Sequence, residues 1–141
     1  MSEAPKRTYP IDMMGLIISA LVALYFSYSW SIDAPPVERV SPEAAKTWFL
    51  FDQIYRWGLF IGAVALVGGA LIAGASGATS PIVRLLALAE GSLGVVFAAM
   101  AIDTLLETRG FDLSVLLTTI LALYCFRAAR DFWLMVRNAE D

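Results

Sequence analysis

The stretch Pro81–Glu107, PIVRLLALAEGSLGVVFAAMAIDTLLE, decides how the rest of the chain must fold. Within it, residues 85–102 form an apolar run of 18 residues whose one charged member is Glu90. A run of this length is long enough to cross the hydrocarbon core of a bilayer as a helix. The stretch therefore predicts a membrane-spanning helix that carries a carboxyl group inside it.

The composition of the whole chain agrees with a membrane protein. Hydrophobic residues make up 59% of the 141 residues, and charged residues only 16%. The net charge of −3, without a basic run, argues against a nucleic-acid partner. The chain has no histidine and one cysteine, Cys125, so the usual ligands of zinc, copper and haem are missing. We therefore expect no metal and no cofactor, and we expect Cys125 to act as a small hydrophobic side chain.

The pattern of apolar segments predicts an all-α integral membrane protein with four transmembrane helices in an up-down bundle, forming one membrane domain over residues 1–141. The predicted spans are residues 12–30, 57–75, 82–103 and 111–130. An amphipathic segment over residues 42–56 precedes the second span, and an amphipathic tail over residues 127–138 follows the fourth. The segment 42–56 either bends near Gly58 or runs straight into the second span.

Small residues recur at helical spacing along the predicted spans and indicate faces where helices approach closely. In the first span these are Gly15, Ser19, Ala23 and Ser27. In the second and third spans the glycines of these faces are Gly58, Gly62, Gly69, Gly91 and Gly94. Such faces predict helix packing, either within one chain or between chains.

Four spans put both termini on the same side of the membrane, and the Lys and Arg counts predict which side that is. Six basic residues fall on the side of the termini, and four on the other: Lys6, Arg7, Arg84, Arg127, Arg130 and Arg137 against Arg39, Lys46, Arg56 and Arg109. The excess predicts a protein of the bacterial inner membrane with both termini in the cytoplasm.

A charged Glu90 inside the membrane needs a partner, because a lone charge near the bilayer centre costs about 2.5–3.5 kcal/mol on insertion scales. Arg127 enters from the same side on the antiparallel fourth span, so Glu90 and Arg127 form a candidate buried pair. Protonation, or hydrogen bonds from hydroxyl groups, would also lower the cost. The candidate hydroxyls are those of Ser92, Thr118, Thr119 and Tyr124. Glu90 then either fixes helix register, carries a proton or cation, or contacts another subunit or a lipid head group.

The sequence leads to two functional hypotheses. The first is a non-catalytic accessory or scaffold subunit that packs against other membrane proteins or copies of itself. The alternative is a small homo-oligomeric proton-coupled transporter or channel that uses Glu90. Four short helices with one membrane carboxyl group resemble the general plan of small proton-coupled exporters, although the glutamate of those proteins lies in their first helix. An intramembrane enzyme ranks last, because few polar residues converge at one depth.

Overall fold

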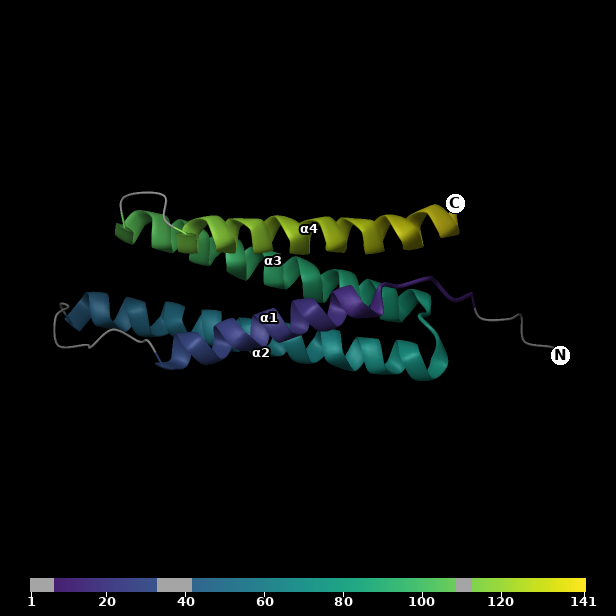
Figure 1. Ribbon diagram of the computed structural model, residues 1–141, viewed down its shortest axis with the longest axis horizontal. Helices are drawn as coiled ribbons and strands as arrows, with labels where there is room; N and C mark the ends of the chain where they lie inside the picture. Colours follow the sequence, from purple (N-terminus) through teal and green to yellow (C-terminus); the bar gives the residue numbers. More distant parts are fainter. Residues whose placement is uncertain (1–6, 33–41, 109–112) are drawn as a thin grey trace.

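The computed structural model describes residues 7–32, 42–108 and 113–141, with side chains over 7–29, 52–106 and 113–141. These residues form an all-helical protein, and no strand occurs among them. Figure 1 shows the four helices, which are α1 (Met13–Ile32), α2 (Pro42–Ser76), α3 (Ser80–Thr108) and α4 (Leu113–Glu140).

Local sequence signals set several helix ends. At the start of α1, the Asp12 carboxylate accepts a hydrogen bond from the backbone N–H of Gly15 at 3.1 Å, which is the N-cap interaction. Helix α2 begins at Pro42, a residue type that suits the first turn. Between α2 and α3 the chain turns at Gly77, whose φ of 85° is the left-handed conformation that ends many helices.

Three of the helices are long and apolar enough to cross a membrane: α3, α4 and the part of α2 from Asp52 onward. The apolar part of α1 that carries described side chains, Met13–Ser29, is shorter. Helix α2 is continuous over 35 residues, so the segment 42–56 runs straight into the predicted second span without a break. Its length of about 52 Å exceeds the roughly 30 Å hydrocarbon core of a bilayer. Helix α4 likewise joins the predicted fourth span and the C-terminal tail.

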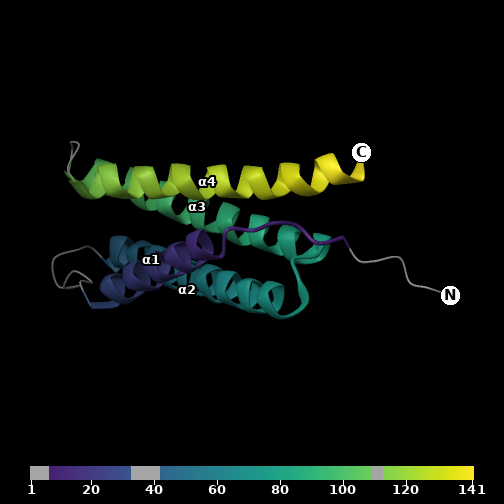
Figure 2. The same ribbon diagram turned by 45° about the vertical axis from the view of Figure 1, so that its right-hand side comes forward.

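The helices alternate in direction, and each packs chiefly against its neighbours in sequence: α1 on α2, α2 on α3 and α3 on α4. The described N-terminal segment before α1, the C-terminal end of α4 and the α2–α3 turn lie at one end of the bundle (Figures 1 and 2). The N-terminal segment is attached there, because the backbone N–H of Tyr9 donates to the Ala78 carbonyl at 2.9 Å. We call this the terminal end of the bundle.

The five predicted packing glycines lie where neighbouring helices of this chain meet. A Cβ atom built at Gly58, Gly62 or Gly69 of α2 would lie 2.5–3.1 Å from side-chain atoms of α3. One built at Gly91 or Gly94 of α3 would lie 3.8 Å or 2.8 Å from side-chain atoms of α4. The small faces of α2 and α3 therefore allow close helix packing within the chain. The largest fully buried side chains on the described parts of these two helices are Leu59, Leu66, Val83, Leu86, Glu90, Leu93, Phe97 and Met100.

Candidate ligand-binding cleft around Glu90

Glu90 lies in the interior of the bundle, where its helix faces both α1 and α4. Its side chain is 1% exposed, which makes it one of the most completely buried residues of the chain. The polar side chains beside its carboxyl group are Ser19 of α1 and Cys125 of α4. Three helices thus contribute to the surroundings of this carboxyl group. The next residue, Gly91, has no side chain to hold α4 away.

The Glu90 carboxyl group is not fully satisfied by the protein. Its Oε2 atom is buried and has no hydrogen-bond partner, and the same holds for Oγ of Ser19. Leaving a neutral polar group in this state costs about 1–3 kcal/mol, and a charged group costs more. The arrangement therefore suits a group that carries a proton or that receives a positively charged ligand.

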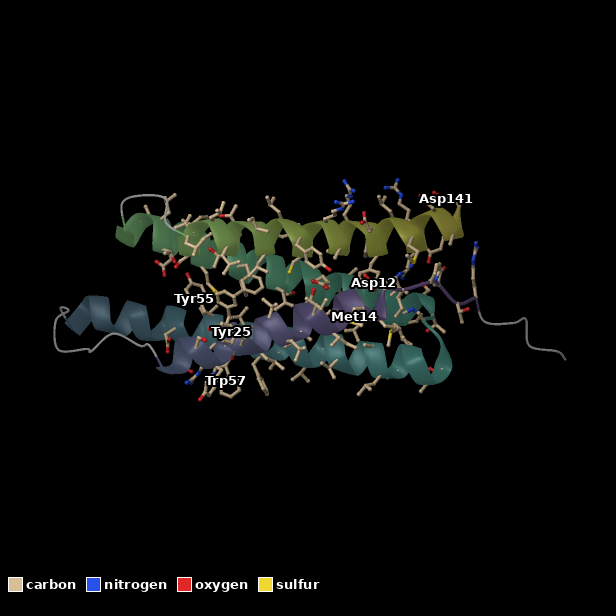
Figure 3. All side chains as sticks on the ribbon, in the orientation of Figure 1. Asp12, Met14, Tyr25, Tyr55, Trp57 and Asp141 are labelled. Atoms are coloured by element: carbon tan, nitrogen blue, oxygen red, sulfur yellow. The ribbon has the colours of Figure 1, made fainter. Side chains whose placement is uncertain are left out.

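Glu90 forms the floor of a cleft between the start of α1 and the second half of α4. The volume of this cleft is about 370 Å³, within the range of small-molecule sites. Its charged lining residues are Asp12, Glu90, Arg127 and Asp131. Its apolar walls include Leu16, Phe132 and Met135, and Tyr124 adds a hydroxyl group. Figure 3 labels Asp12 at the start of α1, beside Met14.

The predicted ion pair between Glu90 and Arg127 does not form. The Arg127 side chain is 78% exposed, and its Nε atom lies 3.9 Å from Oδ2 of Asp131, one turn further along α4. The cause is the position of Arg127 around the axis of α4. Cys125 is the α4 residue beside Glu90, and Arg127, two residues later, lies about 200° around the helix axis from it. Arg127 therefore lines the outer wall of the cleft while Glu90 lies at its floor.

Two of the candidate hydroxyl partners on α4, those of Thr118 and Thr119, bond to the backbone of their own helix. The Thr118 hydroxyl donates to the Ser114 carbonyl at 2.8 Å, and the Thr119 hydroxyl donates to the Val115 carbonyl at 2.7 Å. Both bonds return to the preceding turn of the same helix, as threonine hydroxyls in membrane helices commonly do. The hydroxyl that does lie beside Glu90 is that of Ser19. The sequence pattern indicated Ser19 only as a small packing residue, and nothing in its spacing marked it as a neighbour of Glu90.

Side chains at the terminal end of the bundle connect its elements outside the Glu90 cleft. Arg84 of α3 forms an ion pair with Glu140 near the end of α4. The Arg7 guanidinium donates to the Ala139 carbonyl at 2.9 Å. These contacts tie the N-terminal segment and α3 to the last turn of α4.

Nothing in the described parts of the chain suggests a metal site, because no three His, Cys, Asp or Glu side chains come together there. Comparison with known protein families, curated proteins and solved structures found no match for this chain. The chemistry of the cleft itself, a buried carboxyl group with one unsatisfied oxygen, is therefore the basis for assigning a function.

Proposed function

We propose that this protein is a small integral membrane protein that binds a proton or a cation at Glu90 and moves it across the bilayer, as a proton-coupled transporter or channel. One observation carries the proposal: Oε2 of Glu90 is buried without a hydrogen-bond partner at the floor of an open cleft. A carboxyl group retained only to fix helix register would be expected to have its oxygens paired. Acids inside a membrane commonly mark ion or proton pathways.

Small residues on one face of α1 lie between two separate openings of the bundle. Gly15 lines the Glu90 cleft, and Ser27 lines a second groove near Arg56 and Trp57 on the other side of Ser19. Ser19 and Ser27 are eight residues apart, which is about 12 Å along the helix. The residues between them, Ala20 and Ala23, are buried and separate the two openings. An alternation between the openings would require α1 to move relative to α2 and α4.

The proposal includes an orientation in the bacterial inner membrane. All four helices cross the bilayer, both termini lie in the cytoplasm, and the cleft opens to the cytoplasmic side. Six residues separate Glu90 from Arg84, which puts the carboxyl group about 9 Å inside the cytoplasmic boundary. Protons from the cytoplasm then reach Glu90 past Asp12 and Asp131, while the opposite side is closed in this arrangement.

The test is proton flux in liposomes that contain the purified protein and an internal pH-sensitive dye. A potassium diffusion potential, negative inside, is expected to acidify the interior for the wild type and not for Glu90→Gln, since the amide cannot carry the proton. Glu140→Gln is the matched control, because it makes the same chemical change at an exposed position outside the cleft. Equal flux through the wild type and Glu90→Gln would overturn the proposal.

The second candidate function is that of a non-catalytic accessory or scaffold subunit. It is favoured by α4, whose candidate span is only 22% buried within the chain, against 50% for α3. Side chains such as Leu116, Ile120 and Leu123 leave one flank of α4 available to another membrane protein. The native mass of the protein in mild detergent separates the two functions: stoichiometric companion proteins favour the accessory subunit, and a homo-oligomer favours the transporter.

A further inference from the structure

We infer that the Glu90 cleft binds a small organic ammonium ion, a protonated amine with a short apolar chain. The inference rests on the proposed function and names the class of its ligand. The ammonium group would lie beside Glu90 in the cleft and donate a hydrogen bond to its carboxyl group, whose Oε2 has no partner in the protein. Ser19 lies next to Glu90 and outside the lining of the cleft.

The charge of the cleft favours a cation. Asp12 contributes a carboxylate from the start of α1, Glu90 from α3 and Asp131 from α4. The one guanidinium in the lining is that of Arg127, which is mostly exposed and lies 3.9 Å from Asp131, a carboxylate that Arg130 also approaches to 3.2 Å. The acids of the lining that remain are Asp12 and Glu90. An anionic ligand would meet the Glu90 carboxyl group without a compensating donor at the floor.

The walls of the cleft favour an organic ligand over an inorganic ion. A divalent metal ion requires several oxygen ligands around it, and calcium takes six to eight. The described residues provide no such group. Instead, Leu16, Phe132 and Met135 present apolar surface beside the acids. A short alkyl chain would be removed from water by these side chains, so each added methylene is expected to tighten binding by up to about fourfold.

The volume of the cleft limits the length of the alkyl chain that it can hold. Its volume of about 370 Å³ lies near the lower limit of small-molecule sites. A six-carbon amine is therefore a suitable probe. We use n-hexylammonium, with n-butylammonium to test chain length and n-hexanol as the uncharged compound of equal length.

The experiment is calorimetric titration of the full-length protein in lipid nanodiscs at neutral pH. We expect n-hexylammonium to bind saturably with one site per chain, n-butylammonium to bind about fourfold to fifteenfold more weakly, and n-hexanol not to saturate. Glu90→Gln should weaken n-hexylammonium binding at least tenfold, and Glu140→Gln should leave it unchanged. Ser19→Ala keeps the Glu90 carboxyl group and should weaken n-hexylammonium binding severalfold. This variant provides a second measurement if Glu90→Gln folds poorly.

Two results would overturn the inference. The first is equal n-hexylammonium affinity in the wild type, in Glu90→Gln and in Ser19→Ala. The second is saturable n-hexanol binding of the same strength, since the cleft would then recognise only the apolar chain. The liposome experiment separates this failure from failure of the proposed function. Glu90-dependent proton flux without amine binding would leave the transporter proposal intact, whereas amine binding without flux would leave only the binding site.

Discussion

At the scale of single residues, the unsatisfied oxygen of Glu90 separates a structural role from a functional one. A structural carboxyl group stabilises the fold through its hydrogen bonds, and losing them costs about 1–3 kcal/mol. Oε2 of Glu90 has no such bond to lose. An uncharged amide of nearly the same shape should therefore be tolerated by the fold even though it cannot carry a proton.

We accordingly expect Glu90→Gln to keep the apparent melting temperature of the protein in detergent at or above that of the wild type. Glu140→Gln is the control for the chemical change, since the exposed ion pair between Glu140 and Arg84 contributes little to stability. Differential scanning fluorimetry of the three proteins provides the comparison. A melting temperature several degrees below that of the control would assign Glu90 a structural role.

The sequence identified Glu90 as the important residue of the interior, because a single charge in an apolar run is conspicuous. It did not identify the neighbours of Glu90. Arg127 was predicted as its partner only from its expected depth in the membrane. That depth does not determine which side of α4 a residue occupies. Ser19 was missed for the related reason that the rotation of α1 about its own axis depends on how the whole bundle packs.

At the scale of helices, apolar run length predicted the positions of the elements. The amphipathic segment expected from residue 42 begins at Pro42 as part of α2, and α3 begins at Ser80, two residues before the predicted span. Each helix extends past the predicted span at one end or both, because hydropathy marks the apolar part of a helix and not its polar ends. Hydropathy also left open whether the segment 42–56 is separate, since a helix can continue from water into lipid without a change in backbone geometry.

The packing of α3 on α4 depends on a close approach at Gly94. A Cβ atom there would lie 2.8 Å from Cδ1 of the Phe126 ring, which cannot fold away as an aliphatic chain can. We expect Gly94→Ala to destabilise the protein by about 1–3 kcal/mol, the usual cost of overpacking. Gly68→Ala is the matched control, because nothing lies within 4 Å of its Cβ position. Thermal unfolding in detergent measures both, and equal melting temperatures would refute the close packing of α3 on α4.

At the scale of the whole molecule, the functional proposals require all four helices to cross the membrane. Helix α1 is the critical case, since its described apolar part is the shortest. Two contacts of α1 and the segment before it support the expectation that α1 crosses the membrane. The N-terminal segment is hydrogen bonded to the α2–α3 turn through Tyr9 and Ala78. Since α1 lies antiparallel against α2 (Figure 1), it extends along the same membrane-crossing helix from that end.

The measurement that tests this arrangement most directly is labelling of single cysteines by a membrane-impermeant maleimide, in a Cys125→Ala background. The positions are Thr8→Cys, Ser76→Cys and Leu113→Cys, applied to intact bacterial cells and to inverted vesicles. The predicted result is that Leu113→Cys is labelled in cells, whereas Thr8→Cys and Ser76→Cys are labelled only in inverted vesicles. Labelling of Thr8→Cys together with Leu113→Cys, and not with Ser76→Cys, would contradict a crossing by α1 and with it the cytoplasmic opening of the Glu90 cleft.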